Sequence, residues 1–216
     1  MYTQFPVMDT FNLKLLWLRI IPAFAFTLLS FNVKPVPGKK IIKWAVQQSS
    51  TLRIMGATNV STFGCDIKSY HQPDTIFCSE ENAAYKMVTL KGKLTIDVSS
   101  FDCHNKMLTC DLRKTLKADQ YPQFVINFLS LERAPVIHGD KDFLNGWVEI
   151  QLAGITRTFE VSYAFNKTST AAINLNGSRG FSFADFKLSP PKKMAGIIKV
   201  KDNFNVDFNL LLIPVE

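Results

Sequence analysis

Four cysteines are the residues of this chain whose chemistry is easiest to interpret. They lie close together in the sequence: Cys65, Cys78, Cys103 and Cys110. An even number of cysteines in an exported chain is typical of disulfides, and four cysteines allow three pairings. Buried free thiols and a metal site are the alternatives, but there is no C-x-x-C pair, and His71 and His104 complete no regular ligand set. We therefore predict structural disulfides and no metal site.

The three histidines give no support for catalysis. His71, His104 and His138 form no H-E-x-x-H pair, and the chain has no G-x-S-x-G, Walker or G-x-G-x-x-G motif. His104 follows Cys103, which is the one arrangement that could supply a thiolate nucleophile and its base. A single histidine before a helix is more often a cap or a surface residue. We therefore predict that the chain is not an enzyme and has no catalytic residues and no cofactor.

The elements that must position these side chains are predicted to be β-strands. Apolar and polar residues alternate along most of the chain after Lys40, which is typical of half-buried strands. The clear strands are residues 90–98, 124–131, 147–152, 156–165 and 204–212, and the weaker ones are 52–55, 60–69, 75–78, 171–175 and 180–187. Turns are predicted at Ala153-Gly154 and Asn176-Gly177.

One helix is predicted, from Asn105 to Lys117, because Leu108, Leu112 and Leu116 repeat at the spacing of one helical face and Asn105 is a suitable N-cap. Eight or nine antiparallel strands with one helix, and without β-α-β spacing, indicate an all-β fold, either a closed barrel or a sandwich. Short connections favour a single closed barrel. A barrel of about eight strands can enclose one small ligand or be filled by its own side chains.

The N-terminal segment is predicted to direct export. Residues 15–33 are almost wholly apolar, and Lys14 and Arg19 lie near their start. A basic start, an apolar stretch and a polar continuation are typical of a secretory signal peptide. An uncleaved membrane anchor and a buried helix are the alternatives. We predict residues 1–30 as signal peptide or anchor, 31–42 as linker and 43–216 as the barrel domain, placed in the periplasm or outside the cell.

The charge of the chain argues against nucleic acid as a partner. The 216 residues carry a formal net charge of +7, without any run of five basic residues. We interpret this excess as a solvated basic surface. A membrane would be contacted only through an uncleaved N-terminal segment.

Four stretches of the chain resemble the YceI-like family, exported lipocalin-like barrels that bind polyisoprenoid-type lipids. They are residues 50–63, 101–122, 152–157 (Leu-Ala-Gly-Ile-Thr-Arg) and 183–188 (Phe-Ala-Asp-Phe-Lys-Leu), in the family's order. The resemblance covers about residues 43–214. It implies a single antiparallel eight-stranded lipocalin-like barrel with one short helix, an apolar tunnel for an isoprenoid tail, and binding without catalysis. The four cysteines and Pro190-Pro191 resemble a cysteine-containing branch of the family.

If the barrel holds a lipid, one face of each strand must line the cavity. The apolar residues predicted to bind the ligand are Leu94, Ile96, Phe124, Ile126, Phe128, Val148, Ile150, Phe159, Val161, Phe181, Phe183, Phe208 and Leu210. An isoprenoid or other long apolar lipid is the predicted ligand. The alternative is a structural or interaction barrel with a packed, ligand-free core. Arg113 and Arg157 could bind an acidic headgroup at the mouth, although solvated charges at element ends are the simpler interpretation.

The order of the strands predicts how the cysteines pair. In an up-and-down meander, strands 60–69 and 90–98 run parallel, two places apart, with strand 75–78 between them. The end of strand 90–98 then approaches Cys65, which predicts a Cys65–Cys103 disulfide. A Cys78–Cys110 disulfide follows by elimination.

Overall fold

The computed structural model describes residues 41–80, 87–136, 141–168, 172–193 and 197–215. The segment predicted to be a signal peptide or anchor, residues 1–30, lies outside them. Among the described residues, no helix has the length and apolar character needed to cross a membrane.

Strands make up most of the described residues, together with three helical elements. The helical elements are η1 (Val98–Ser100), α1 (Lys106–Thr115) and η2 (Phe183–Phe186). The strands are β1 (Ile41–Val46), β2 (Thr51–Ala57), β3 (Thr62–Ile67), β4 (Thr75–Glu80), β5 (Val88–Asp97), β6 (Gln123–Leu131), β7 (Asp142–Leu152), β8 (Ile155–Lys167), β9 (Ile173–Ser182), β10 (Lys192–Lys193), β11 (Ile198–Lys199) and β12 (Asn203–Val215).

Eight of the strands close into an antiparallel barrel. Their order is β1-β4-β5-β6-β7-β8-β9-β12, and β12 pairs with β1 to complete the ring. At this closing seam Lys43 lies opposite Val215 and Val46 lies opposite Leu212. The predicted eight-stranded antiparallel barrel with one helix is therefore confirmed.

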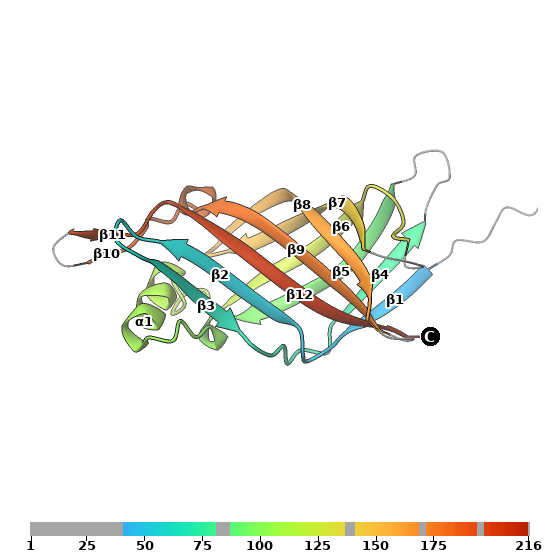
Figure 1. Ribbon diagram of the computed structural model, residues 1–216, viewed down its shortest axis with the longest axis horizontal. Helices are drawn as coiled ribbons and strands as arrows, with labels where there is room; N and C mark the ends of the chain where they lie inside the picture. Colours follow the sequence, from blue (N-terminus) through green and yellow to red (C-terminus); the bar gives the residue numbers. More distant parts are fainter. Residues whose placement is uncertain (1–40, 81–86, 137–140, 169–171, 194–196, 216) are drawn as a thin grey trace, which may run out of the picture. The chain divides into compact units, whose positions relative to one another are not determined.

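A hairpin of β2 and β3 extends the barrel at one end. β12 pairs with β2 from Asn205 to Asn209, whereas its C-terminal end pairs with β1 from Leu212 to Val215. β1 and β2 therefore pair with successive parts of the same strand, β12. β3 pairs with β2. Figure 1 shows this hairpin and α1 at one end of the barrel, and β1 and β4 at the opposite end.

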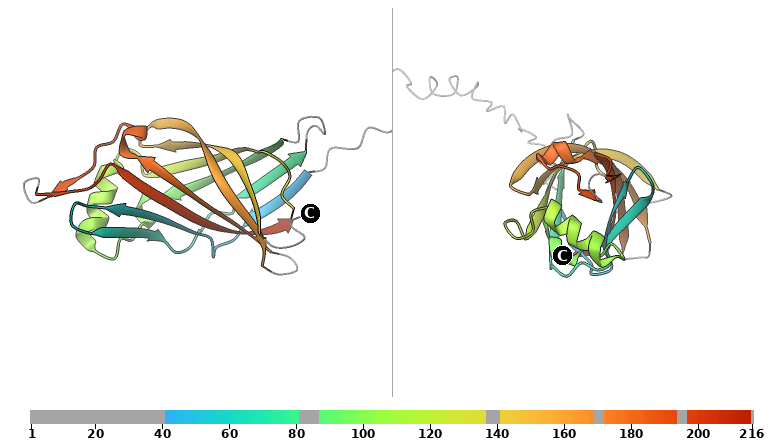
Figure 2. Two further views of the ribbon diagram at one scale, coloured as in Figure 1. Left: turned by 45° about the horizontal axis from the view of Figure 1, so that its top comes forward. Right: turned by 90° about the vertical axis from the view of Figure 1, so that its left-hand side faces the viewer.

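Helix α1 lies at the barrel end that carries the β2–β3 hairpin (Figure 2). Asn105 caps it as predicted, because its side chain accepts a hydrogen bond from the Leu108 amide at 3.1 Å. Leu108 and Leu112 pack against the core, and Leu116 after the helix is buried. The predicted leucine face is therefore the face that α1 turns towards the barrel.

Strand β9 differs from the sequence prediction, which placed a turn at Asn176-Gly177 between two short strands. β9 instead runs unbroken from Ile173 to Ser182 and pairs with β12 throughout. A Cβ atom at Gly177 would lie 2.1 Å from the ring of Phe208. This glycine is therefore needed for the close approach of an aromatic ring and not for a turn.

Strand β1 begins inside the segment predicted to be a linker. Ile41 lies opposite Ser79 of β4, and Ile42 lies opposite Cys78. Pairing with β4 extends the strand towards the N-terminus because the backbone groups of both segments gain hydrogen-bond partners. Two residues of the predicted linker, Ile41 and Ile42, therefore belong to a strand of the barrel.

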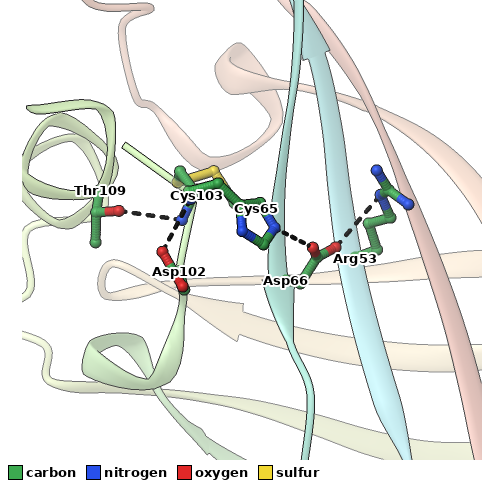
Figure 3. A network of polar contacts seen from close by, with 7 residues as sticks. Arg53, Cys65, Asp66, Asp102, Cys103 and Thr109 are labelled. Carbon is green, nitrogen blue, oxygen red and sulfur yellow. Dashed lines mark hydrogen bonds and ion pairs between the residues drawn. A yellow bond between two sulfur atoms is a disulfide. The ribbon is translucent and has the colours of Figure 1, made fainter. Parts of the chain in front are cut away.

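Cys65 and Cys103 form the predicted disulfide, but the arrangement that joins them is not the predicted meander. β3 pairs with β2 and not with β4. An isolated bridge, in which the Asp66 and Asp102 amides donate to each other's carbonyls at 2.8 and 3.0 Å, brings the cysteines together. The Cys103 amide also donates to the Thr109 hydroxyl at 3.0 Å (Figure 3). The disulfide thus fastens the hairpin to the segment that precedes α1.

The second predicted disulfide, Cys78–Cys110, is wrong. Cys78 is buried in β4 and Cys110 is exposed on α1, and neither is in a disulfide. Since β4 and α1 lie at opposite ends of the barrel (Figure 1), their sulfur atoms cannot meet. The elimination argument failed because it assumed that all four cysteines pair.

Candidate functional site

The barrel encloses a cavity of about 130 Å³. Side chains from β2, β3, β5 to β9, β12, α1 and η2 line it. A few residues from the connections between these elements complete the lining. Most of these side chains are aliphatic or aromatic, so the surface that a ligand would meet is apolar.

Twelve of the thirteen residues predicted to contact a ligand line this cavity: Leu94, Ile96, Phe124, Ile126, Phe128, Val148, Ile150, Val161, Phe181, Phe183, Phe208 and Leu210. Phe159 is the exception. It is buried on the same face of β8, but its ring packs edge-on against Phe181, with 5.0 Å between centroids, and beside Phe186 at 5.7 Å. Phe159 therefore packs against residues of the cavity lining without being part of it.

The cavity occupies only the half of the barrel nearest α1. Along β8, Val161 and Tyr163 line it but Phe165 does not, and along β12 Leu210 lines it but Leu212 does not. Phe165 and Leu212 are almost wholly buried among neighbouring side chains such as Trp44, whose ring centroid lies 6.2 Å from that of Phe165. The half towards β1 and β4 is thus a packed core, which closes the inner end of the cavity.

Helix α1 covers part of the other end. Leu108, Leu112 and Leu116 line the cavity, as does Asp111 on the same helix. Seen from that end, α1 lies beside the opening of the barrel (Figure 2). The predicted helix therefore contributes side chains to the cavity. The sequence had given no indication of this role.

Tyr163 lines the cavity, but its hydroxyl oxygen is buried within the protein. The residue is only 2% exposed, and its hydroxyl has no hydrogen-bond partner among the described residues. Burial raises the pKa of the Tyr163 hydroxyl well above its usual value, so the group stays protonated at neutral pH. It is therefore a buried hydrogen-bond donor that has no partner among the described residues.

Arg179 is the basic residue of the lining. Its Nη1 donates a hydrogen bond to the backbone carbonyl of Glu160. The guanidinium carbon lies 4.9 Å from the ring centroid of Phe159 and 5.5 Å from that of Phe181. The aromatic rings therefore hold the cation at the cavity wall.

The two arginines considered as headgroup ligands have structural roles instead. Arg113 donates to the backbone carbonyl of Ser99 at 2.6 Å, and Arg157 donates through Nε to the carbonyl of Asp185 at 3.2 Å. Neither lines the cavity. Each fastens an element to a neighbouring segment at this end of the barrel.

Cys103 and His104 do not form a nucleophile–base pair. The sulfur of Cys103 is in the disulfide, and Nε2 of His104 lies 2.7 Å from Oδ2 of Asp66. Within the part of the chain that the structure describes, no three His, Cys, Asp or Glu side chains gather as metal ligands would.

Several polar residues of the lining were missed by the sequence reasoning, among them Tyr163 on β8, Arg179 on β9 and Asp111 on α1. The alternation along 159–165 could have identified Tyr163, because it shares the face of Val161. Arg179 precedes Phe181 by two residues and therefore shares its face, but the wrongly predicted turn at Asn176-Gly177 interrupted that strand.

The comparisons with known proteins agree with this architecture. The sequence matches the YceI-like domain over residues 75–212, more than half of the chain. No curated protein matches it. Among solved structures, BcnA of Burkholderia cenocepacia is similar with a TM-score of 0.54 and 20% identity, covering 75% of this chain and 95% of that one. A polyisoprenoid binding domain from Saccharophagus degradans, implicated in plant cell wall breakdown, has a TM-score of 0.55 and 12% identity, covering 81% and 99%. At these identities the likeness concerns the fold.

Proposed function

Because this chain belongs to the YceI-like family, we propose that it is a non-enzymatic binding protein that holds an isoprenoid or other long apolar lipid inside its barrel. The observation that carries the proposal is the apolar cavity in one half of a closed barrel. The solved domain from Saccharophagus degradans, described as polyisoprenoid-binding, supports the class of ligand.

Burial of the lipid tail is the proposed mechanism. Each methylene group moved from water into an apolar site contributes about 0.8 kcal/mol before the costs of ordering, so the affinity should grow with the length of tail that the cavity takes up. A close-packed end formed by Trp44, Phe165 and Leu212 would limit how far the tail enters. The site needs no catalytic group for this task.

Export is part of the proposal. It is supported by the Cys65–Cys103 disulfide, since disulfides persist in oxidising compartments, and by the signal-like sequence of residues 1–30. Fractionation of the native host tests it. Recovery of the chain outside the cytoplasm is expected, and recovery with the cytoplasmic proteins would contradict it.

Native mass spectrometry of the protein purified from its own host tests the binding function. We expect a mass excess that organic extraction removes, and an apolar lipid in the extract. A protein that carries no lipid, and takes up none from a mixture of isoprenoid and acyl lipids, would favour the alternative of a ligand-free structural or interaction barrel.

A further inference from the structure

Two exposed aliphatic side chains lie at the barrel end that α1 partly covers. Val60, in the turn between β2 and β3, and Ile197, just before β11, are each 69% exposed. Figure 1 shows the β10–β11 ribbon at the same end as α1 and the β2–β3 hairpin. A single exposed aliphatic residue needs no explanation, but two on adjoining tips indicate a contact surface.

Hydrogen bonds hold the two tips together. The Asn59 amide donates to the Lys199 carbonyl at 3.1 Å, and the Lys199 amide donates to Oδ1 of Asn59 at 3.0 Å. Nδ2 of Asn59 also donates to the Ile197 carbonyl at 3.0 Å. Because Val60 directly follows Asn59, Val60 and Ile197 belong to one continuous surface.

Lysines accompany these aliphatic residues. Residues 192–202 contain four lysines and one acidic residue. Lys192 of β10 lies directly opposite Lys199 of β11, and like charges in such positions destabilise a strand pair. Lys199 and Lys201 are exposed, and no ion pair among the described residues involves them. The positive charge of this ribbon is therefore available to an anionic partner.

The same segment adjoins the cavity. Val200, between the two exposed lysines, lines the cavity, and its amide donates at 3.3 Å to the carbonyl of Pro191, which also lines it. Successive residues of an extended chain point to opposite sides, so Lys199 and Lys201 face away from the cavity that Val200 faces. We call the exposed surface beside the cavity mouth the rim: Val60, Ile197, Lys199 and Lys201.

We propose that the rim docks the barrel on an anionic lipid bilayer. Val60 and Ile197 enter the headgroup region, and the ammonium groups of Lys199 and Lys201 contact the lipid phosphates. The mouth of the cavity then faces the bilayer, so an apolar ligand can pass between them without crossing bulk water. Docking does not depend on the proposed lipid-binding function, whereas this route for the ligand does.

The composition of the rim favours a bilayer over a protein partner. Interfaces between proteins are depleted in lysine, and their binding energy comes mostly from buried aromatic and arginine anchors. The rim consists of two lysines and two aliphatic residues. That combination is typical of segments that bind the surface of anionic membranes.

The test places a polarity-sensitive bimane label on the full-length protein. Cys110→Ser removes the exposed thiol, and Val60→Cys then provides the labelling position. Val136→Cys is the matched control, because Val136 is also an exposed valine but lies in the β6–β7 connection, at the end of the barrel opposite α1. Vesicles consist of phosphatidylcholine alone or of equal amounts of phosphatidylcholine and phosphatidylglycerol.

We expect anionic vesicles to shift the emission of the label at position 60 to shorter wavelength and to leave the label at position 136 unchanged. Neutral vesicles should cause a much smaller shift, and added salt should weaken the binding to anionic vesicles because it screens surface charge.

Lysine variants carrying the label at position 60 assign the binding to the rim. Lys199→Gln combined with Lys201→Gln should weaken binding to anionic vesicles about tenfold or more, since each lysine near such a surface contributes about fivefold. Lys91→Gln combined with Lys93→Gln is the matched control, because these exposed lysines of β5 change the net charge equally. It should bind as the unsubstituted protein does. The N-terminal segment is the same in all variants, so differences between them belong to the barrel.

The outcomes separate docking from the proposed function. If the label at position 60 does not shift, shifts equally with neutral vesicles, or shifts equally after both rim lysines are replaced, the docking proposal is wrong and lipid binding in the cavity stands. A shift that follows protein concentration without vesicles would identify a second copy of the chain as the partner and would also overturn docking. The expected shifts from a protein that takes up no lipid would support docking and contradict the proposed function.

Discussion

At the scale of single residues, Val161 gives the most direct test of the cavity. It is 4% exposed and lines the cavity, whereas its neighbours Glu160 and Ser162 are exposed on the other face of β8. Val161→Asp places a carboxylate among apolar side chains. We expect lipid uptake to be lost and the free energy of unfolding, measured by chemical denaturation, to fall by about 3 kcal/mol or more.

Glu160→Ala is the control for this variant. Its side chain is exposed, so both lipid uptake and the free energy of unfolding should change little. A Val161→Asp protein with unchanged melting temperature and lipid binding would show that the cavity is not the binding site.

Tyr163→Phe should separate stability from binding. The Tyr163 hydroxyl is buried without a hydrogen-bond partner among the described residues, so the lipid-free protein loses no bond with it. We expect the free energy of unfolding to stay the same or to rise by about 1 kcal/mol, while lipid uptake changes little because the hydroxyl oxygen is buried. A clear loss of stability in denaturation experiments would mean that the hydroxyl has a partner in solution.

Single residues also show which features of the cavity could not be inferred from the sequence. Alternation placed Val161 and Leu94 on the inward face correctly, because a strand has a period of two wherever its limits are known. It could not show that Phe159, on the same face as Val161, does not line the cavity, because this depends on how the ring of Phe181 packs against it. Arg179 was overlooked because an incorrect turn interrupted the face to which it belongs.

At the scale of elements, the Cys65–Cys103 disulfide joins β3 to the segment before α1 across 38 residues of sequence. A loop of this length corresponds to about 4 kcal/mol on the chain-entropy model. Cys103→Ser should therefore lower the free energy of unfolding by about that amount under oxidising conditions. Cys110→Ser, at an exposed position outside any disulfide, is the control and should have little effect.

Reduction of the disulfide offers a second measurement. The wild-type protein should lose a similar free energy of unfolding in the presence of a reductant, while Cys103→Ser should not respond. Equal stability of the wild type with and without reductant would contradict the predicted contribution.

The connection between β6 and β7 predicts an acid-sensitive component of stability. Arg133 contacts both carboxylate oxygens of Asp142, at 2.7 and 2.5 Å, and the Val136 amide donates to the same group. The hydrogen bond from Arg133 lowers the pKa of Asp142 to about 2, against 3.8 for the free side chain. A lowered folded-state pKa stabilises the protein above the unfolded pKa, and this contribution disappears as the pH falls from about 5 towards 2.

Asp142→Asn removes this titration. The variant should be less stable than the wild type at pH 7, and the difference should shrink as the pH falls towards 2. Denaturant midpoints measured across this range provide the check. A difference that stays constant over the whole range would show that the carboxylate charge contributes nothing.

Elements were predictable where one local signal determined them. The Ala153-Gly154 turn is present, with φ of 50° and 79° at its two residues. A two-residue hairpin needs a positive φ at both positions, and this requirement is local to the turn. Asn176-Gly177 carries the same kind of signal and forms no turn, since Phe208 from β12 occupies the space beside the glycine. The difference depends on a neighbour far along the chain.

At the scale of the whole molecule, barrel closure was predictable, but the break between β1 and β2 was not. The break between β1 and β2 depends on Ser50, which is buried and whose hydroxyl accepts a hydrogen bond from the Leu211 amide of β12 at 3.1 Å. This long-range bond stabilises the turn that follows Gln47 and lets β2 continue along β12. Nothing local in the sequence distinguishes such a turn from an ordinary loop.

The closing seam predicts that the barrel folds without the segment before it. β1 joins β4 to β12 from Ile41 onwards, and the buried Trp44 belongs to the packed half of the barrel. A chain that begins at Pro35 should therefore fold, remain soluble without detergent, and match the full-length protein in melting temperature and lipid affinity. A chain that begins at Gln47 lacks β1, so the ring cannot close, and it should be insoluble or unfolded by circular dichroism. If the Pro35 chain is insoluble while the full-length protein is soluble without detergent, the barrel needs residues that precede it, and the proposed division into an export segment and an independent domain is wrong.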